Sequence, residues 1–121
     1  MTTDGSPRLT THVLDTTRGC PAAGLAVTLV ALDEVDAPTV VVVTNADGRT
    51  DAPLLSGAAL SPGRYELTFA VGAYFAGLGG PATGEAYLDD VPVRFTVTPA
   101  TGSVHVALLV TPWSYTTYRG S

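Results

Sequence analysis

Lysine is absent from this 121-residue chain, and charge of either sign is scarce: six arginines and eleven acidic residues make up 14% of the sequence. The net charge of −5 argues against non-specific binding of nucleic acid, which depends on clustered cations that displace counterions. Hydrophobic residues account for 45%, the reverse of the balance in a disordered chain. We therefore expect a packed fold, and the low charge favours surface that is hidden in an oligomer.

Cysteine and long hydrophobic runs are scarce as well. Cys20 is the only cysteine, which excludes an intramolecular disulfide and a four-cysteine zinc site. The longest apolar runs have the length of strands, and residues 1–11 lack the apolar stretch of a signal peptide, so neither a membrane span nor a membrane partner is expected. The length suits one domain. We expect a single cytoplasmic domain over residues 1–121, with residues 1–7 flexible.

What the sequence does contain is a series of short segments with the pattern of β-strands, punctuated by Gly, Pro, Asn and Asp. In residues 64–71 and 91–98, successive side chains alternate between apolar and polar, as half-buried strands require. Residues 72–78 favour a short helix, and residues 77–84 a loop. The expected strands are residues 8–15, 25–32, 39–44, 64–71, 91–98, 103–111 and 114–118. This spacing predicts an all-β fold, a sandwich of two antiparallel sheets with one short helix.

The two histidines are the residues best suited to proton transfer near neutral pH. In the first strand, alternation places His12 on the same face as Thr10. In the strand at residues 103–111, His105 shares a face with Ala107. In both strands this face is opposite the more apolar one. Periodicity alone favours structural or surface histidines, and the functional alternative is a general acid–base pair. A metal site is not expected, because no third ligand stands at a recognisable spacing.

Two further segments carry unusual polar groups. Arg49 follows an Asn-Ala-Asp-Gly turn at residues 45–48. A solvated arginine is the simplest interpretation, but at a strand end its guanidinium could bind a planar carbonyl or urea group. Residues 115–121 contain two tyrosines and an arginine, whereas chain ends are usually polar and frayed. A final edge strand that covers the core explains the aromatic residues, but not the terminal Arg-Gly-Ser.

Three separated motifs together resemble the 5-hydroxyisourate hydrolase family, whose members are related to transthyretin. The first is Leu-Thr-Thr-His-Val-Leu-Asp-Thr at residues 9–16, continued by Gly-Cys-Pro-Ala. The second is Thr-Asn-Ala-Asp-Gly-Arg-Thr at residues 44–50, and the third is the terminal Tyr-Arg-Gly-Ser. The resemblance covers nearly the whole chain and implies a transthyretin-like, or prealbumin-like, sandwich. The sequence departs from the usual pattern of this family at residues 87–88, 104–107 and 111. These differences affect the shape of the pocket, whereas the groups expected to transfer protons are still present.

This resemblance also implies an activity and a site. Hydrolysis of 5-hydroxyisourate, an oxidised purine of urate breakdown, gives 2-oxo-4-hydroxy-4-carboxy-5-ureidoimidazoline, and neither a cofactor nor a metal is expected. The catalytic residues carried over are His12, Arg49 and His105. The substrate-binding residues carried over are Thr111, Tyr118, Arg119, Gly120 and Ser121. Which histidine is the general base stays open. The family further implies a homotetramer, with sandwiches that pair edge to edge and then pack face to face.

Two other classes of function fit the predicted fold, because a fold by itself does not determine function. A transthyretin-like carrier would bind a small aromatic ligand without turnover, but it does not need both histidines, Arg49 and the terminal motif. A structural or adhesive sandwich module usually belongs to a larger extracellular chain. Ligand binding without turnover would distinguish the carrier from the enzyme.

Overall fold

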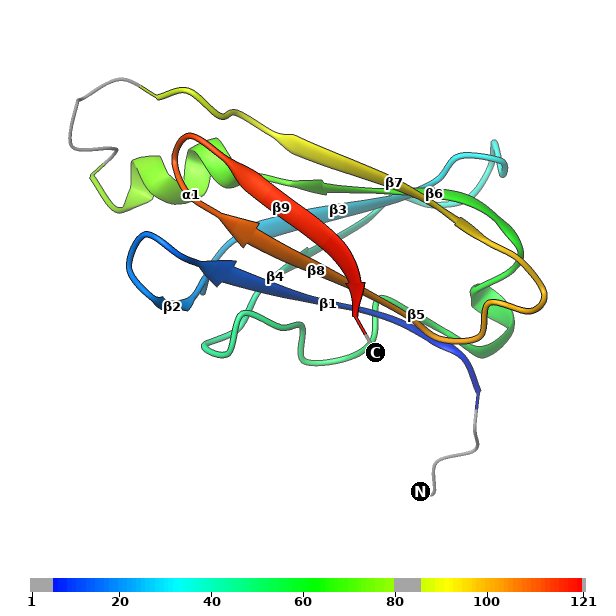
Figure 1. Ribbon diagram of the computed structural model, residues 1–121. Helices are drawn as coiled ribbons and strands as arrows, with labels where there is room; N and C mark the ends of the chain where they lie inside the picture. The colour runs from blue at the N-terminus through cyan, green and yellow to red at the C-terminus, as the bar shows by residue number, and fades with distance from the viewer. Residues whose placement is uncertain (1–5, 80–85, 121) are drawn as a thin grey trace.

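Two β-sheets packed face to face form the protein, as seen in a computed structural model that describes residues 6–79 and 86–120 (Figure 1). The first sheet has the strand order β2 (Cys20–Pro21), β1 (Arg8–Asp15), β8 (Val104–Val110) and β9 (Tyr115–Gly120), and β5 (Leu55–Ser56) pairs with the start of β1. The second has the order β4 (Val40–Val43), β3 (Ala26–Ala31), β6 (Gly63–Phe69) and β7 (Val91–Val97). The helix α1 (Val71–Gly77) lies at one end, and Gly57–Ala59 forms a 3-10 turn. The predicted all-β sandwich with one short helix is confirmed.

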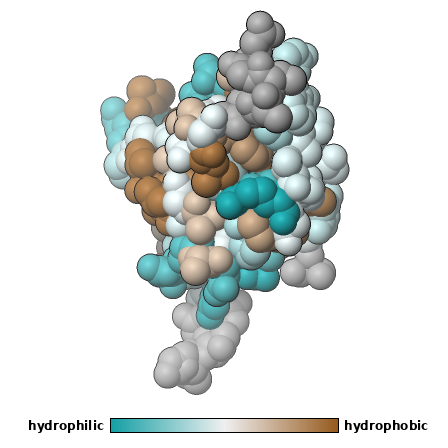
Figure 2. Space-filling model, turned by 90° about the vertical axis from the view of Figure 1, so that its left-hand side faces the viewer, coloured by the Kyte–Doolittle hydropathy of each residue, from teal (hydrophilic) through white to brown (hydrophobic). Residues whose placement is uncertain are grey.

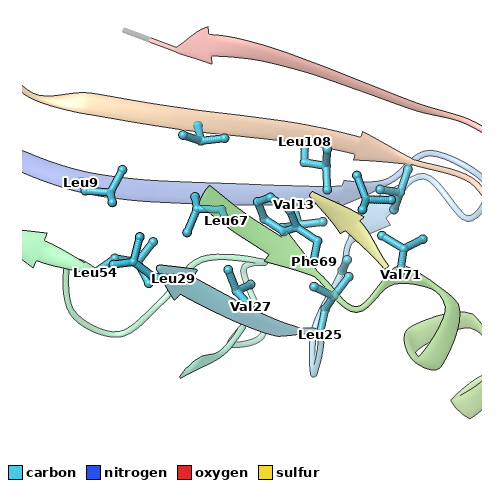
Figure 3. Close-up of a cluster of buried hydrophobic side chains, with 14 of the residues drawn as sticks. Leu9, Val13, Leu25, Val27, Leu29, Leu54, Leu67, Phe69, Val71 and Leu108 are labelled. Atoms are coloured by element: carbon cyan, nitrogen blue, oxygen red, sulfur yellow. The ribbon is translucent and has the colours of Figure 1, made fainter. Parts of the chain in front are cut away.

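The core consists of alternate side chains from the facing sides of the two sheets (Figure 3). Leu9 and Val13 of β1 and Leu108 of β8 are fully buried, as are Leu67 and Phe69 of β6. Burying a side chain of this size stabilises a fold by roughly 1.5–3 kcal/mol. Because strand residues alternate between faces, the intervening residues of β1 and β8, including both histidines, point away from this core.

Strands β1 and β8 run parallel, unlike the other strand pairs in the described residues. The prediction of antiparallel sheets therefore does not hold for this pair. The register sets Thr10 opposite His105 and His12 opposite Ala107. Residues opposite each other on neighbouring strands share a face, so both histidines lie on the outer face of the first sheet.

Several boundaries differ from those predicted. The predicted strand to Val71 ends at Phe69, and Val71 begins α1. The Val71 side chain is fully buried in the core, so it continues the apolar alternation of β6 whether the backbone is strand or helix. The sequence does not predict the short strands β2 and β5, because two residues are too few to show an alternation of apolar and polar side chains. Of the predicted loop at residues 77–84, Gly77 ends the helix, and residues 80–84 lie outside the described residues.

A buried carboxylate joins the end of β1 to α1. Asp15 has no exposed surface, and its Oδ2 accepts hydrogen bonds from Arg18 Nε at 2.9 Å and from the Tyr74 hydroxyl at 2.8 Å. Its Oδ1 accepts the backbone N–H groups of Thr17 and Arg18. Arg18 also donates to the Tyr74 hydroxyl. This network fixes the turn after β1 against the helix.

Apolar side chains also remain on the surface. Val41 and Val43 of the edge strand β4 are 64% and 58% exposed, and Tyr115 and Tyr118 of β9 are 44% and 56% exposed. The prediction that these tyrosines cover the core is therefore wrong. Seen from the α1 end, hydrophobic residues form small groups among hydrophilic ones (Figure 2). None of the helices in the described ranges has the length and apolar character to cross a bilayer.

Candidate active site

His12 and His105 occupy neighbouring strands on the outer face of the first sheet. The parallel register offsets them by two residues, with Thr10 directly beside His105. Both imidazoles are half-buried. On the core-facing side of the same strand, the Thr11 hydroxyl donates to the backbone carbonyl of Val106 at 2.7 Å, which helps hold β1 and β8 together. The two histidines are therefore held by a rigid pair of strands.

Arg49 reaches this face through the turn before it. The Asn45 side-chain oxygen accepts the backbone N–H groups of Asp47 and Arg49, at 2.9 and 3.2 Å. Gly48 has a φ of +74°, and a Cβ there would collide with the carbonyl oxygen of Val13, so this position requires glycine. The turn docks on β1 through Val13 N–H, which donates to Gly48 O at 2.8 Å.

The docked turn sets Arg49 opposite His12 in an isolated antiparallel bridge. Their side chains therefore share the outer face. In residues 6–79 and 86–120, the Arg49 guanidinium makes no hydrogen bond or ion pair, whereas three other arginines are paired with carboxylates. Arg49 thus offers an exposed cation with free N–H donors beside the two histidines.

The electrostatics of this face keep His105 neutral. Burial lowers the pKa of His105 below its ordinary value of 6.5, and the nearby positive charge of Arg49 and then of His12 lower it further. The Nδ1 atom of His105 lies 2.8 Å from the Thr10 hydroxyl oxygen. At neutral pH, His105 is therefore a neutral imidazole that can accept a proton.

A pocket of about 220 Å³ opens beside Arg49 and Thr10, and neither histidine is among the residues that line it. Its lining combines residues of β1 with Arg49 and the segment after it: Arg8, Thr10, Thr11, Arg49, Thr50, Asp51, Ala52 and Pro53. The volume suits a small polar molecule rather than a large ligand. Guanidinium and hydroxyl groups at its wall are donors suited to carbonyl oxygens.

The C-terminal strand brings two of its four predicted residues to the site. Tyr118 is opposite Ala107 and Gly120 is opposite His105, so both belong to the outer face. A Cβ on Gly120 would collide with the imidazole of His105. Arg119 belongs to the other face, where it donates to the backbone carbonyls of Thr101 and Ser103 at 2.9 and 3.1 Å. The fourth predicted residue, Ser121, lies outside the described residues.

Thr111 is not brought near the histidines. It follows the far end of β8, six residues from His105, or about 20 Å along an extended strand. Its hydroxyl accepts the backbone N–H groups of Trp113 and Ser114, at 3.1 and 2.9 Å. Within one copy of the chain, Thr111 therefore organises the turn between β8 and β9.

Thr10 is a site residue that the sequence did not single out. Alternation alone puts it on the face of His12, so a polar residue two positions before a candidate histidine was a usable signal. Its hydrogen bond to His105 depends on the β1–β8 register, and 95 residues separate the two. The described residues contain no cluster of three or more His, Cys, Asp or Glu side chains that could hold a metal ion.

Comparison with known proteins identifies relatives by sequence and solved structures that resemble this chain. A 5-hydroxyisourate hydrolase of Deinococcus radiodurans is 53% identical, over 97% of this chain and 98% of the relative. The solved structure of an (S)-allantoin synthase matches the whole chain with a TM-score of 0.88 and 43% identity, although the match covers only 46% of that longer protein.

Two further solved structures resemble this chain, one a 5-hydroxyisourate hydrolase and the other a transthyretin. The Klebsiella pneumoniae 5-hydroxyisourate hydrolase matches with a TM-score of 0.79 and 35% identity, over 95% of this chain and 99% of its own. Transthyretin from Sparus aurata has a TM-score of 0.78 and 26% identity, over 93% of this chain and 96% of its own. The model of the HIUase/Transthyretin family matches residues 9–120. The chain therefore belongs to the HIUase/Transthyretin family.

Proposed function

We propose that this protein hydrolyses 5-hydroxyisourate by attack of water on a cyclic amide of the substrate. The observation that carries the proposal is the grouping of His12, His105 and the unpaired Arg49 on one outer sheet face, with His105 neutral at neutral pH. A neutral imidazole can accept a proton from water, and a free guanidinium can bind a carbonyl oxygen. The high identity to named hydrolases supports the same activity.

His105 acts as the general base in this mechanism. It takes one proton from water while the water oxygen forms a bond to the acyl carbon of the ring. His105 then returns this proton to the ring nitrogen as the C–N bond breaks, while His12 positions the water. The acyl carbon becomes a carboxylic acid that loses its remaining proton to solvent, and the nitrogen becomes part of a ureido group, so that one water is consumed and His105 is neutral again. The lowered pKa of His105 favours it for the first step, because at neutral pH the imidazole is unprotonated.

Arg49 stabilises the oxyanion that forms on the carbonyl oxygen during attack. Its side chain lies at the pocket wall without another partner among the described residues, so its N–H groups are available to the substrate. Preorganised donors at a developing oxyanion are often the largest single contribution to catalysis. Tyr118 and Gly120 border the same face, and we include them in the substrate-binding surface.

The functional form is a homotetramer in which outer faces of the first sheet pack against each other. Two observations support this: the site is open in one copy of the chain, and apolar side chains such as Tyr118 remain 56% exposed. A second copy would cover the face and exclude water from the reacting groups. The cytoplasmic location stays a prediction from the sequence.

The decisive experiment follows the decay of 5-hydroxyisourate, generated in situ by urate oxidase, by ultraviolet absorbance. Wild-type protein should accelerate the decay, and His105→Asn and His12→Asn should each lower kcat by about 10²–10⁴-fold. Thr28→Val, on the outer face of the other sheet, is the matched control and should leave the rate unchanged. A folded wild-type protein that binds the substrate without accelerating its decay would indicate a carrier instead.

A further inference from the structure

The imidazole of His105 is held from both sides by neighbouring strands. On the β1 side, the Thr10 hydroxyl oxygen lies 2.8 Å from Nδ1. On the β9 side, the backbone of Gly120 lies against the ring, and an added Cβ would overlap Cδ2 and come within 3.2 Å of Cγ. Both residues are directly opposite His105 in the sheet register. The ring therefore has little room to turn about its side-chain torsions.

This arrangement leaves one ring nitrogen of His105 without a protein partner among the described residues. Nδ1 faces the Thr10 hydroxyl, and Cδ2 faces the backbone of Gly120. Nε2 is therefore the ring nitrogen without a partner among the described residues. A neutral imidazole carries one proton, and the partner of one nitrogen determines the role of the other. If Nδ1–H donates to Thr10, the Nε2 lone pair is free to accept a proton.

The surrounding charge favours that tautomer. Arg49 and His12 share the outer face with His105, and Arg8 and Asp51 line the adjoining pocket. A cationic guanidinium nearby interacts favourably with a lone pair and unfavourably with an N–H that points toward it. With Nδ1 turned to the Thr10 hydroxyl, Nε2 is the position for the lone pair and Nδ1 the position for the hydrogen.

Thr10 also has no competing structural task. Its hydroxyl makes, in the part of the chain that the structure describes, a single hydrogen bond, the one to His105. The next residue is a useful contrast: the Thr11 hydroxyl is buried and donates to the backbone of β8, as expected of a threonine that holds two strands together. Thr10 is half-buried and faces the pocket.

We propose that Thr10 is a positioning residue, which accepts the Nδ1–H of His105 and thereby directs the Nε2 lone pair toward the substrate. The inference rests on the proposed hydrolysis for its catalytic consequence, but the tautomer itself is a property of the free protein. Thr10→Val keeps the β-branched shape while removing the oxygen, and Thr10→Ser keeps the oxygen.

The first measurement is the tautomer of His105, from the ¹⁵N chemical shifts of the imidazoles in protein labelled at histidine. The chain has only two histidines, and the His12→Asn variant assigns the signals. We expect the Nδ1–H tautomer to dominate in the wild type and in Thr10→Ser. In Thr10→Val it should give way to a mixture. A dominant Nε2–H tautomer in the wild type, or an unchanged tautomer in Thr10→Val, would overturn the proposal.

Turnover gives the second readout. Thr10→Val should lower kcat by about 10–10²-fold, the scale of a misplaced catalytic group, with KM nearly unchanged, and Thr10→Ser should restore most of the rate. Full kcat in a folded Thr10→Val would also contradict the proposal. Absence of turnover in the wild type would refute the proposed function, whereas the tautomer measurement would still decide the role of Thr10.

Discussion

At Arg49, one substitution can separate the hydrogen-bonding geometry of the guanidinium from its positive charge. Replacing it with lysine keeps one positive charge but removes the planar fork that can hold a carbonyl oxygen through two N–H groups. We expect Arg49→Lys to lower kcat/KM by about 10²-fold, the scale of losing an oxyanion donor. Arg94→Lys is the matched control, because Arg94 pairs with Glu66 on the second sheet. Equal activity of the two variants would remove Arg49 from the mechanism.

The pH dependence of the reaction depends on His105. Burial, then Arg49 and His12, lower its pKa from 6.5, so the neutral base persists to a pH below that value and is lost as the pH falls through the lowered pKa. The acidic limb of kcat/KM should therefore have its midpoint below 6.5. Titration of the imidazole by NMR should give the same midpoint. In Arg49→Gln the midpoint should move upward, because one repelling charge is gone; a downward shift would contradict this electrostatic account.

At the scale of strands, the sequence predicts well wherever one face of a segment is buried. The strand at residues 8–15 has the predicted bounds, and burial alternates along it. Periodicity also places both histidines on the faces where they are found. It cannot supply the register between β1 and β8, which are about 90 residues apart, and that register is what joins Thr10 to His105. The sequence also does not show that the last strand continues to Gly120, past the predicted end at residue 118. It is this extension that places Arg119 on the face opposite to Tyr118 and Gly120.

The connection between β1 and α1 gives a prediction about stability. Asp15→Asn would leave Arg18 and Tyr74 facing a neutral amide in place of a buried carboxylate. We expect a loss of about 1–3 kcal/mol in the free energy of unfolding, measured by urea denaturation, because a buried hydrogen-bonded charge is replaced. Asp33→Asn removes the carboxylate of an exposed pair with Arg64 and should cost much less. Equal losses in the two variants would show that burial of the network is unimportant.

The Asp15 carboxylate also makes the free energy of unfolding depend on pH in the acidic range. Burial alone would raise the pKa of Asp15, but hydrogen bonds from Arg18 and Tyr74 outweigh it and hold the pKa below 3.8. The unfolded chain therefore binds more protons at this group than the folded chain does. Its contribution to stability is present above pH 3.8 and is lost as the pH falls through the lowered pKa. The stability difference between wild type and Asp15→Asn should accordingly shrink in acid.

For the whole molecule, the question is which face would meet a second copy in the proposed tetramer. The outer face of the first sheet carries the site at one end, and farther along it Leu14, Leu109 and Thr116 lie side by side in register. Val41 and Val43 expose apolar surface on the other sheet. Exposed apolar surface alone therefore does not identify the interface. We propose the outer face of the first sheet as the interface, because covering it would also enclose the histidines.

A charged residue introduced on the outer face of either sheet shows which of the two faces forms the contact between copies. Light scattering of the wild type should give a mass about four times the 12.4 kDa of one chain. Leu109→Glu places an unpaired carboxylate in the proposed contact, where its desolvation opposes association. We expect its mass to fall to that of a dimer and kcat/KM to fall at least about tenfold, because the site then opens to water. Val41→Glu should leave mass and rate unchanged. A fully active wild-type monomer would mean that this face works uncovered and that the chemistry is complete within one chain. A Leu109→Glu variant that remains a tetramer would mean that the contact between copies lies elsewhere.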